Sequence, residues 1–228
     1  MPTYKNSGRT LKTLFAAITI SAMTTGAAMS ENGESRLIEA AERGDVRTIG
    51  SLLSGGVKID ARNARGETAL LAATHANNIE AAKRLIEAGA DVNARDNIQD
   101  SPYLYAGARG QLEILRLTLA HGADLKSTNR YGGTALIPAS ERGHVETVKT
   151  LIEAGVDVDH VNNLGWTALL EAIILGDGGA RHVQIVRLLV EAGAATGIPD
   201  KDGVTALQHA RSRGFTEIAA ILETAKRQ

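Results

Sequence analysis

An internal repeat with a period of 33 residues restricts the folds that this chain can adopt. Threonine or serine recurs at this interval, and a series of glycines with one asparagine keeps the same step. The two series are Thr68, Ser101, Thr134 and Thr167, and Gly44, Asn77, Gly110, Gly143 and Gly176. Each series then jumps by 38 residues, to Thr205 and Gly214, so five residues, Asp177 to Arg181, are inserted once. A fixed period of this length predicts a solenoid in which each unit contacts its neighbours.

Each unit has the pattern of two short helices joined by a tight turn. In the unit from Gly132 to Asp159, the Thr134 hydroxyl is expected to cap the first helix by accepting a free N–H of its first turn. Gly143 then ends that helix in the left-handed conformation. The apolar face of the second helix comprises Val145, Val148, Leu151 and Ile152. Since so small a pair cannot bury its own apolar face, we expect stability to come from stacking of neighbouring units.

The repeated residues resemble the ankyrin repeat. The resemblance rests on the period, on the Gly-x-Thr-(Pro/Ala)-Leu start and on the Leu-(Ile/Val)-Glu-Ala-Gly-Ala-Asp-Val-Asn ending, which are clearest in residues 66–93 and 132–159. It implies an all-α ankyrin-repeat solenoid of about six helix-turn-helix units with β-turn fingers. The implied repeats are approximately 33–62, 63–95, 96–128, 129–161, 162–199 and 200–226, within a domain of residues 31–228.

Two residues depart from this pattern. Gln99 replaces the turn glycine of the third unit, which suggests a different turn there. Asn77 replaces a helix-ending glycine, but asparagine tolerates the left-handed conformation. The segment from Leu164 to Gly179 also looks like a subgroup of bacterial exported ankyrin proteins.

Residues 1–30 have the features of a Sec-type signal peptide. Three positive residues, Lys5, Arg9 and Lys12, precede an apolar stretch at 14–23 and a run of small residues. The sequence leaves two cleavage positions open, before residue 29 and before residue 31. A membrane anchor is disfavoured, because a spanning helix needs roughly 20 apolar residues. We therefore expect export to the bacterial periplasm, with secretion as the alternative, and no contact with the membrane after cleavage.

Composition excludes several classes of function. The formal net charge is −1, and removal of the signal peptide makes the remaining chain more acidic, which disfavours nucleic acid and anionic membranes as partners. The chain has no cysteine, so disulfides, thiolate catalysis and zinc–thiolate sites are excluded. We expect neither a cofactor nor a metal, and a monomeric chain whose partner is another protein.

The resemblance also implies where that partner binds. Ankyrin proteins generally bind through their turn tips and the exposed side of the first helix, and interface hot spots are enriched in Trp, Tyr and Arg. The candidate partner-binding residues are Arg65, Tyr105, Arg109, Tyr131, Arg142, Trp166 and Glu171. Trp166, the only tryptophan, has a structural alternative, in which it packs against the preceding turn and stiffens the finger.

The case for an enzyme is weak. His144 and His182 occupy one repeat column, which in ankyrin repeats usually joins neighbouring loops by hydrogen bonds. The other histidines lack metal-ligand spacing, and Ser140 does not lie in a Gly-x-Ser-x-Gly motif. The glycine-rich loop at 176–181 is interpreted as a tolerated insertion, available to a partner, in preference to a phosphate or metal site. We predict that the protein is not an enzyme.

These features together predict a non-catalytic scaffold for protein–protein interaction in the bacterial periplasm. The resemblance suggests an accessory role beside a stress-protection enzyme. The alternatives are a periplasmic immunity protein that neutralises a toxin, a secreted effector, and a hydrolase that uses the groove.

Overall fold

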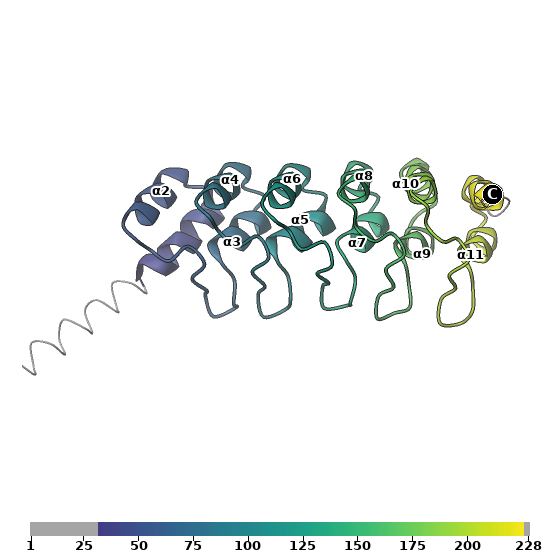
Figure 1. Cartoon of the computed structure of the whole chain (residues 1–228), viewed down its shortest axis with the longest axis horizontal. Helices are drawn as coiled ribbons and strands as arrows, with labels where there is room; N and C mark the ends of the chain where they lie inside the picture. Colours follow the sequence, from purple (N-terminus) through teal and green to yellow (C-terminus); the bar gives the residue numbers. More distant parts are fainter. Residues whose placement is uncertain (1–31, 226–228) are drawn as a thin grey trace, which may run out of the picture.

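The computed structural model describes residues 32–225, which form six stacked pairs of helices (Figure 1). After the helical residues 32–43, the elements are α2 (Val46–Ser54), α3 (Ala69–His75), α4 (Ile79–Glu87), α5 (Pro102–Arg109), α6 (Leu112–Ala120), α7 (Leu136–Glu141), α8 (Val145–Glu153), α9 (Ala168–Ile174), α10 (Ala180–Glu191), α11 (Ala206–Ser212) and α12 (Thr216–Ala225). The predicted all-α solenoid is therefore confirmed. The expected signal peptide lies outside the described residues. None of the helices within residues 32–225 is long and apolar enough to cross a membrane.

The helices form two rows, with fingers that project to one side (Figure 1). The inner row contains residues 32–43, α3, α5, α7, α9 and α11, and the outer row contains α2, α4, α6, α8, α10 and α12. Outer helices bury leucines at equivalent positions, such as Leu85, Leu151 and Leu189, which are 0% exposed. Inner helices approach closely because their facing residues are small: a Cβ added at Gly107 would lie 2.8 Å from the Cβ of Ala135. Neighbouring units thus bury the apolar faces that a single pair would expose.

Of the five inner helices α3, α5, α7, α9 and α11, four begin at a capping hydroxyl. The side chains of Thr68, Ser101, Thr167 and Thr205 each accept a hydrogen bond from the backbone N–H three residues later, at 3.2–3.4 Å. The predicted cap at Thr134 is wrong: α7 has no side-chain cap bond, and the buried Thr134 hydroxyl has no partner within the described residues.

Pro138 explains the exception at Thr134. In the other four units, the carbonyl of the capping residue accepts the N–H four residues later, for example Glu171 N–H to Thr167 O at 2.9 Å. Proline has no N–H at that position and disfavours helical geometry in the residue before it. The Thr134 carbonyl instead accepts the N–H of Ile137 at 3.3 Å, which is the donor that the hydroxyl would need.

Replacing Pro138 by alanine should therefore stabilise the protein by about 1 kcal/mol, because an N–H for the Thr134 carbonyl and a hydroxyl cap are both restored. Urea denaturation followed by circular dichroism measures the change. Thr134→Ala provides the control: we expect little loss in the wild-type background and about 1 kcal/mol in the Pro138→Ala background. A full loss in both backgrounds would show that the hydroxyl already caps the helix.

The turn residues follow the predicted backbone, with one correction at Gln99. Gly143 and Asn77 adopt left-handed conformations, with φ of 72° and 54°. Gln99 also has a positive φ, 70°, as the turn glycines Gly66 and Gly132 do, so the different turn expected there is wrong. The Arg95 guanidinium donates to the Gln99 side-chain oxygen at 3.1 Å, which helps to hold this strained residue in place.

The five-residue insertion changes both the loop and the following helix. Ala180 and Arg181 already belong to α10, which has 12 residues where α8 has nine. The repeat pattern places the left-handed glycine at Gly176, but the structure places it at Gly178, with φ of 68°. A Cβ at Gly178 would lie 2.5 Å from Cε1 of Phe215 in the next unit, so the insertion has moved the glycine that meets its neighbour.

One repeat column joins successive units through their loops. The side-chain amide of Asn78 donates to the backbone carbonyl of Glu42 in the preceding unit, at 2.7 Å. The amide of Gln111 donates to the carbonyl of Thr74 in the same way, at 2.9 Å. His182 Nε2 lies 2.9 Å from the Glu141 carbonyl in the same manner. The predicted structural role of this histidine position is thus confirmed for His182.

Candidate protein-interaction surface

The fingers are held in shape by an asparagine or aspartate at the same position in five units. Its side-chain oxygen accepts two backbone N–H groups, two and four residues later, at 2.8–3.1 Å. These residues are Asn63, Asp96, Asn129, Asn162 and Asp200. This series was not predicted from the sequence, although its members share the intervals of the repeat. The bonds close each turn and fix the direction of the side chains at its tip.

Three consecutive fingers carry large apolar side chains at their tips. Ile98, Tyr131 and Leu164 occupy equivalent positions and are 52%, 56% and 47% exposed. We call these three residues the fingertip row. Tyr131 and the finger of Leu164 were expected at the binding surface. Ile98 was not expected there, although it lies one repeat period, 33 residues, before Tyr131 and could have been identified by that spacing.

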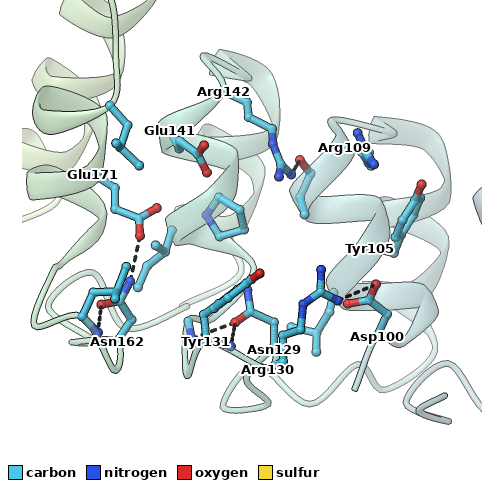
Figure 2. A pocket seen from close by; sticks show the side chains of 17 residues that line it. Asp100, Tyr105, Arg109, Asn129, Arg130, Tyr131, Glu141, Arg142, Asn162 and Glu171 are labelled. Atoms are coloured by element: carbon cyan, nitrogen blue, oxygen red, sulfur yellow. Dashed lines mark hydrogen bonds and ion pairs between the residues drawn. The ribbon is translucent and has the colours of Figure 1, made fainter. Parts of the chain in front are cut away.

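A hollow of about 250 Å³ lies between the fingers and the inner helices α5, α7 and α9. Five of the seven candidate residues line it, which brings together the side chains of Tyr105, Arg109, Tyr131, Arg142 and Glu171. Leu164 and the 49% exposed Leu175 line it as well. Figure 2 shows Tyr131 and Asn162 on the finger side, with Arg109 and Arg142 along the opposite edge.

The three arginines of the hollow are held by different contacts. The Arg109 guanidinium lies 5.3 Å from the ring centroid of Tyr105, and that of Arg130 lies 5.1 Å from the ring centroid of Tyr131. Arg130 also faces Asp100 at 3.8 Å. Arg142 donates to the Ala108 carbonyl near the end of α5, at 2.6 Å. Arg142 therefore has a structural bond between units in addition to its place at the edge of the hollow.

The other two candidate residues lie elsewhere. Arg65 lines a separate hollow, where its guanidinium is 2.6 Å from the buried carboxylate of Glu67, and the second oxygen of Glu67 is 2.8 Å from His75. Burial opposes ionisation of Glu67, but its hydrogen bonds hold the pKa below the usual value. Trp166 is half-buried against the core and does not line either hollow. That position favours the structural alternative for Trp166, and its contact with a partner stays a prediction.

Glu171 is a buried carboxyl group on the floor of the hollow. It is 6% exposed, and its Oε1 accepts a hydrogen bond from the Asn162 amide at 2.7 Å (Figure 2). Burial, followed by the nearby charge of Glu141, raises the pKa of Glu171 to about 7, although Asn162 and Arg142 act in the opposite direction. Near neutral pH, this group is therefore present in both protonation states.

The raised pKa of Glu171 predicts a stability that falls as pH rises. The folded chain binds a proton at Glu171 more tightly than the unfolded chain does. The contribution of this proton to the stability of the fold is therefore complete below the ordinary glutamate pKa of 4.5, and it is lost as pH rises through about 7. The free energy of unfolding of Glu171→Gln, measured relative to wild type, should therefore rise by about 2 kcal/mol between pH 5 and pH 8. Urea denaturation at the two pH values measures the difference, and a constant difference would contradict the raised pKa.

Among residues 32–225, no group of three or more His, Asp or Glu side chains is arranged to hold a metal ion. Packing and hydrogen bonds between repeats hold the acidic and basic side chains of the hollow in place. They lie on the surface between the fingertip row and the far ends of α5, α7 and α9, which we call the strip. On the finger side, the hollow offers the ring of Tyr131 beside the Arg130–Asp100 pair. The opposite edge offers the guanidinium groups of Arg109 and Arg142, and the buried carboxyl group of Glu171 also lines the hollow.

Comparison with known proteins gives one consistent family. The family model for ankyrin repeats, in three copies, matches residues 5–96 and again residues 103–195. The Escherichia coli K12 protein YahD, described as an ankyrin repeat protein, is 54% identical over 52 residues, which are 23% of this chain and 26% of that protein. The chain thus spans about a quarter of the length of this curated relative.

Solved structures resemble the chain over most of its length. An ankyrin repeat domain from Acinetobacter baumannii AYE is 67% identical, with a TM-score of 0.83, and covers 85% of this chain and 98% of its own. The ankyrin repeat protein EF0377 is 46% identical, with a TM-score of 0.80 and coverages of 83% and 97%. The ankyrin repeat domain of Bcl-3, a member of the IκB family, is 27% identical, with a TM-score of 0.73 and coverages of 83% and 85%.

Proposed function

The chain belongs to the ankyrin-repeat family, whose members generally act as non-catalytic scaffolds for protein–protein interaction, and on this basis we propose that it binds another protein through the hollow and the fingertip row. The observation that carries the proposal is the exposure of three large apolar side chains at equivalent finger positions, beside arginines and a second tyrosine. Exposed apolar groups surrounded by polar ones are typical of interaction sites.

The proposal extends to the place of action. Residues 1–30 have the charge and apolar pattern of an exported chain, so we place the scaffold in the bacterial periplasm. The sequence resemblance to exported bacterial ankyrin proteins favours an accessory role beside a stress-protection enzyme. Fractionation of cells that express the full chain tests the location: protein found only in the cytoplasm would overturn it.

A capture experiment tests the binding surface. The protein is immobilised and exposed to periplasmic extract, and captured proteins are compared between wild type and the double variant Tyr131→Ala, Leu164→Ala. Since truncated hot spots each cost about 2 kcal/mol or more, we expect the partner to be lost from the double variant.

Val161→Ala is the matched control for this experiment. Val161 is 46% exposed, similar to Leu164, but does not line the hollow. We expect the control to retain the partner, and all variants to keep the wild-type circular dichroism spectrum. Capture that survives in the double variant would place the binding surface elsewhere, and a captured toxin would favour the immunity alternative.

A further inference from the structure

We propose that the group seated between the fingertip row and the inner helices is an amphipathic α-helix of the partner, with apolar residues seven apart and acidic residues along one flank. The inference rests on the proposed function and adds the kind of partner. It follows from the spacing of the apolar tips, the width of the strip beside them, and the arginines on its far edge.

The spacing of the fingertip row fits a helix and does not fit a strand. Ile98, Tyr131 and Leu164 belong to successive units, whose packed helices are separated by roughly 8–10 Å. Seven residues of an α-helix advance about 10.5 Å and return to nearly the same face. Three residues of a β-strand advance about 10 Å but end on the opposite face, and two or four residues advance about 7 or 13 Å. An α-helix can therefore place a side chain of one face near each pair of tips, and a β-strand cannot. A polyproline II segment also returns to one face, after three residues and about 9.3 Å, so the width of the strip decides between these two.

The width of the strip also matches a helix. The tips lie before the first residue of each inner helix, and Arg109, Arg142 and Leu175 lie at the other end of those helices. Inner helices of six to eight residues are roughly 9–12 Å long. The distance across the strip is thus close to the diameter of one α-helix with its side chains, about 10–12 Å.

The far edge of the strip favours an acidic flank on that helix. Among the described residues, neither Arg109 nor Arg142 forms an ion pair with a carboxylate, in contrast to Arg65 and Arg130. Guanidinium groups commonly bind carboxylates through two parallel hydrogen bonds, in a bidentate geometry. The finger side carries the apolar tips, and its one guanidinium, that of Arg130, already faces Asp100. The expected partner helix therefore has its apolar face toward the fingers and its carboxylates toward Arg109 and Arg142.

The ends of the row set the length of the bound segment. The equivalent finger positions outside the row hold Arg65 and Asp202, which are charged. Three apolar tips span two repeat intervals, roughly 16–20 Å, which corresponds to about 11–13 residues of helix. About three turns of helix therefore occupy the apolar part of the strip.

Selection from a displayed library of random 20-residue peptides tests this proposal. The full chain is the bait, and peptides that also bind the double variant Tyr131→Ala, Leu164→Ala are removed. We expect the enriched sequences to carry apolar residues at i, i+3 or i+4, and i+7, with Asp or Glu along one flank. Synthetic peptides of these sequences should gain helical circular dichroism when the protein is added.

A charge reversal tests the orientation. Arg109→Glu should weaken binding of the acidic peptides about tenfold or more, and versions with Lys in place of the acidic residues should regain affinity for this variant. Arg116→Glu makes the same charge change on the exposed side of the outer helix α6 and should leave binding unchanged.

The outcomes separate this inference from the proposed function. Enriched peptides with alternating apolar residues, or with basic flanks, would overturn the helix even if they depend on Tyr131 and Leu164, and the binding surface would stand. A selection that enriches nothing would also overturn the helix. Loss of the natural partner from the double variant in the capture experiment would still support the surface in either case.

Discussion

Replacing Asn162 by alanine should lower the free energy of unfolding by about 3 kcal/mol. The Asn162 side chain accepts the N–H groups of Leu164 and Trp166, at 2.9 and 3.0 Å, and donates to the buried carboxyl of Glu171 at 2.7 Å. Each partly buried group that loses its hydrogen bond costs about 1–3 kcal/mol. Urea denaturation followed by the fluorescence of Trp166, the only tryptophan, reports directly on this finger.

Two further substitutions separate the finger from the buried carboxyl group. Asn129→Ala removes the same two backbone bonds one unit earlier, where no buried carboxyl depends on the side chain, so we expect about half the loss. Asn162→Asp keeps the acceptor, as Asp96 and Asp200 do, but places a second carboxylate beside Glu171. The loss in free energy of unfolding caused by Asn162→Asp should be small at pH 5 and larger at pH 8. Equal losses for the two alanine variants would show that Glu171 does not depend on Asn162.

The fold could be predicted from the sequence because residues with the same structural role recur at the same position of several repeats. The capping hydroxyls at Thr68 and Thr167, and the left-handed residue at Gly143, each repeat at a fixed interval and have one local physical role. Agreement between columns therefore compensates for weak signals within any one helix. Gln99 shows the strength of this constraint, since the repeat imposes the glycine conformation on a residue that prefers another.

Two errors arose where a proline or an insertion changes a local hydrogen bond or the register of the repeat. Pro138 lies four residues after Thr134, and only the hydrogen-bond pattern shows that its missing N–H affects the cap. The insertion at 177–181 left Gly176 in the expected column, but its extra residues lengthen α10 and move the left-handed position to Gly178. Spacing alone does not reveal how an insertion divides between loop and helix.

The candidate surface was predicted in part. The repeat brings Tyr105, Arg109 and Arg142 to one strip because equivalent positions of successive units align. The raised pKa of Glu171 could not be predicted, since it depends on burial and on a neighbour from another unit, Glu141. The exposure of Ile98 depends on how the finger is folded, which the asparagine and aspartate series determines.

Replacing Gly178 by alanine should destabilise the protein by about 3 kcal/mol. With φ of 68°, this position costs a residue with a Cβ about 1 kcal/mol. The added Cβ would also lie 2.5 Å from Cε1 of Phe215, and relief of such overpacking typically costs about 1–3 kcal/mol more. Because Phe215 lies in the next unit, directly before α12, the clash acts on a repeat–repeat interface, and urea denaturation monitored by circular dichroism measures the loss.

Gly214 provides the matched control, because it has nearly the same φ, 70°, but a Cβ added there meets no atom within 4 Å. Gly214→Ala should therefore cost only about 1 kcal/mol. Combining Gly178→Ala with Phe215→Ala should cost less than the sum of the two single changes, by about 1–2 kcal/mol, since the clash is absent when the ring is removed. If the effects of the two changes simply add, the loss at Gly178 comes from its backbone conformation alone, and the insertion does not act through its contact with the final unit.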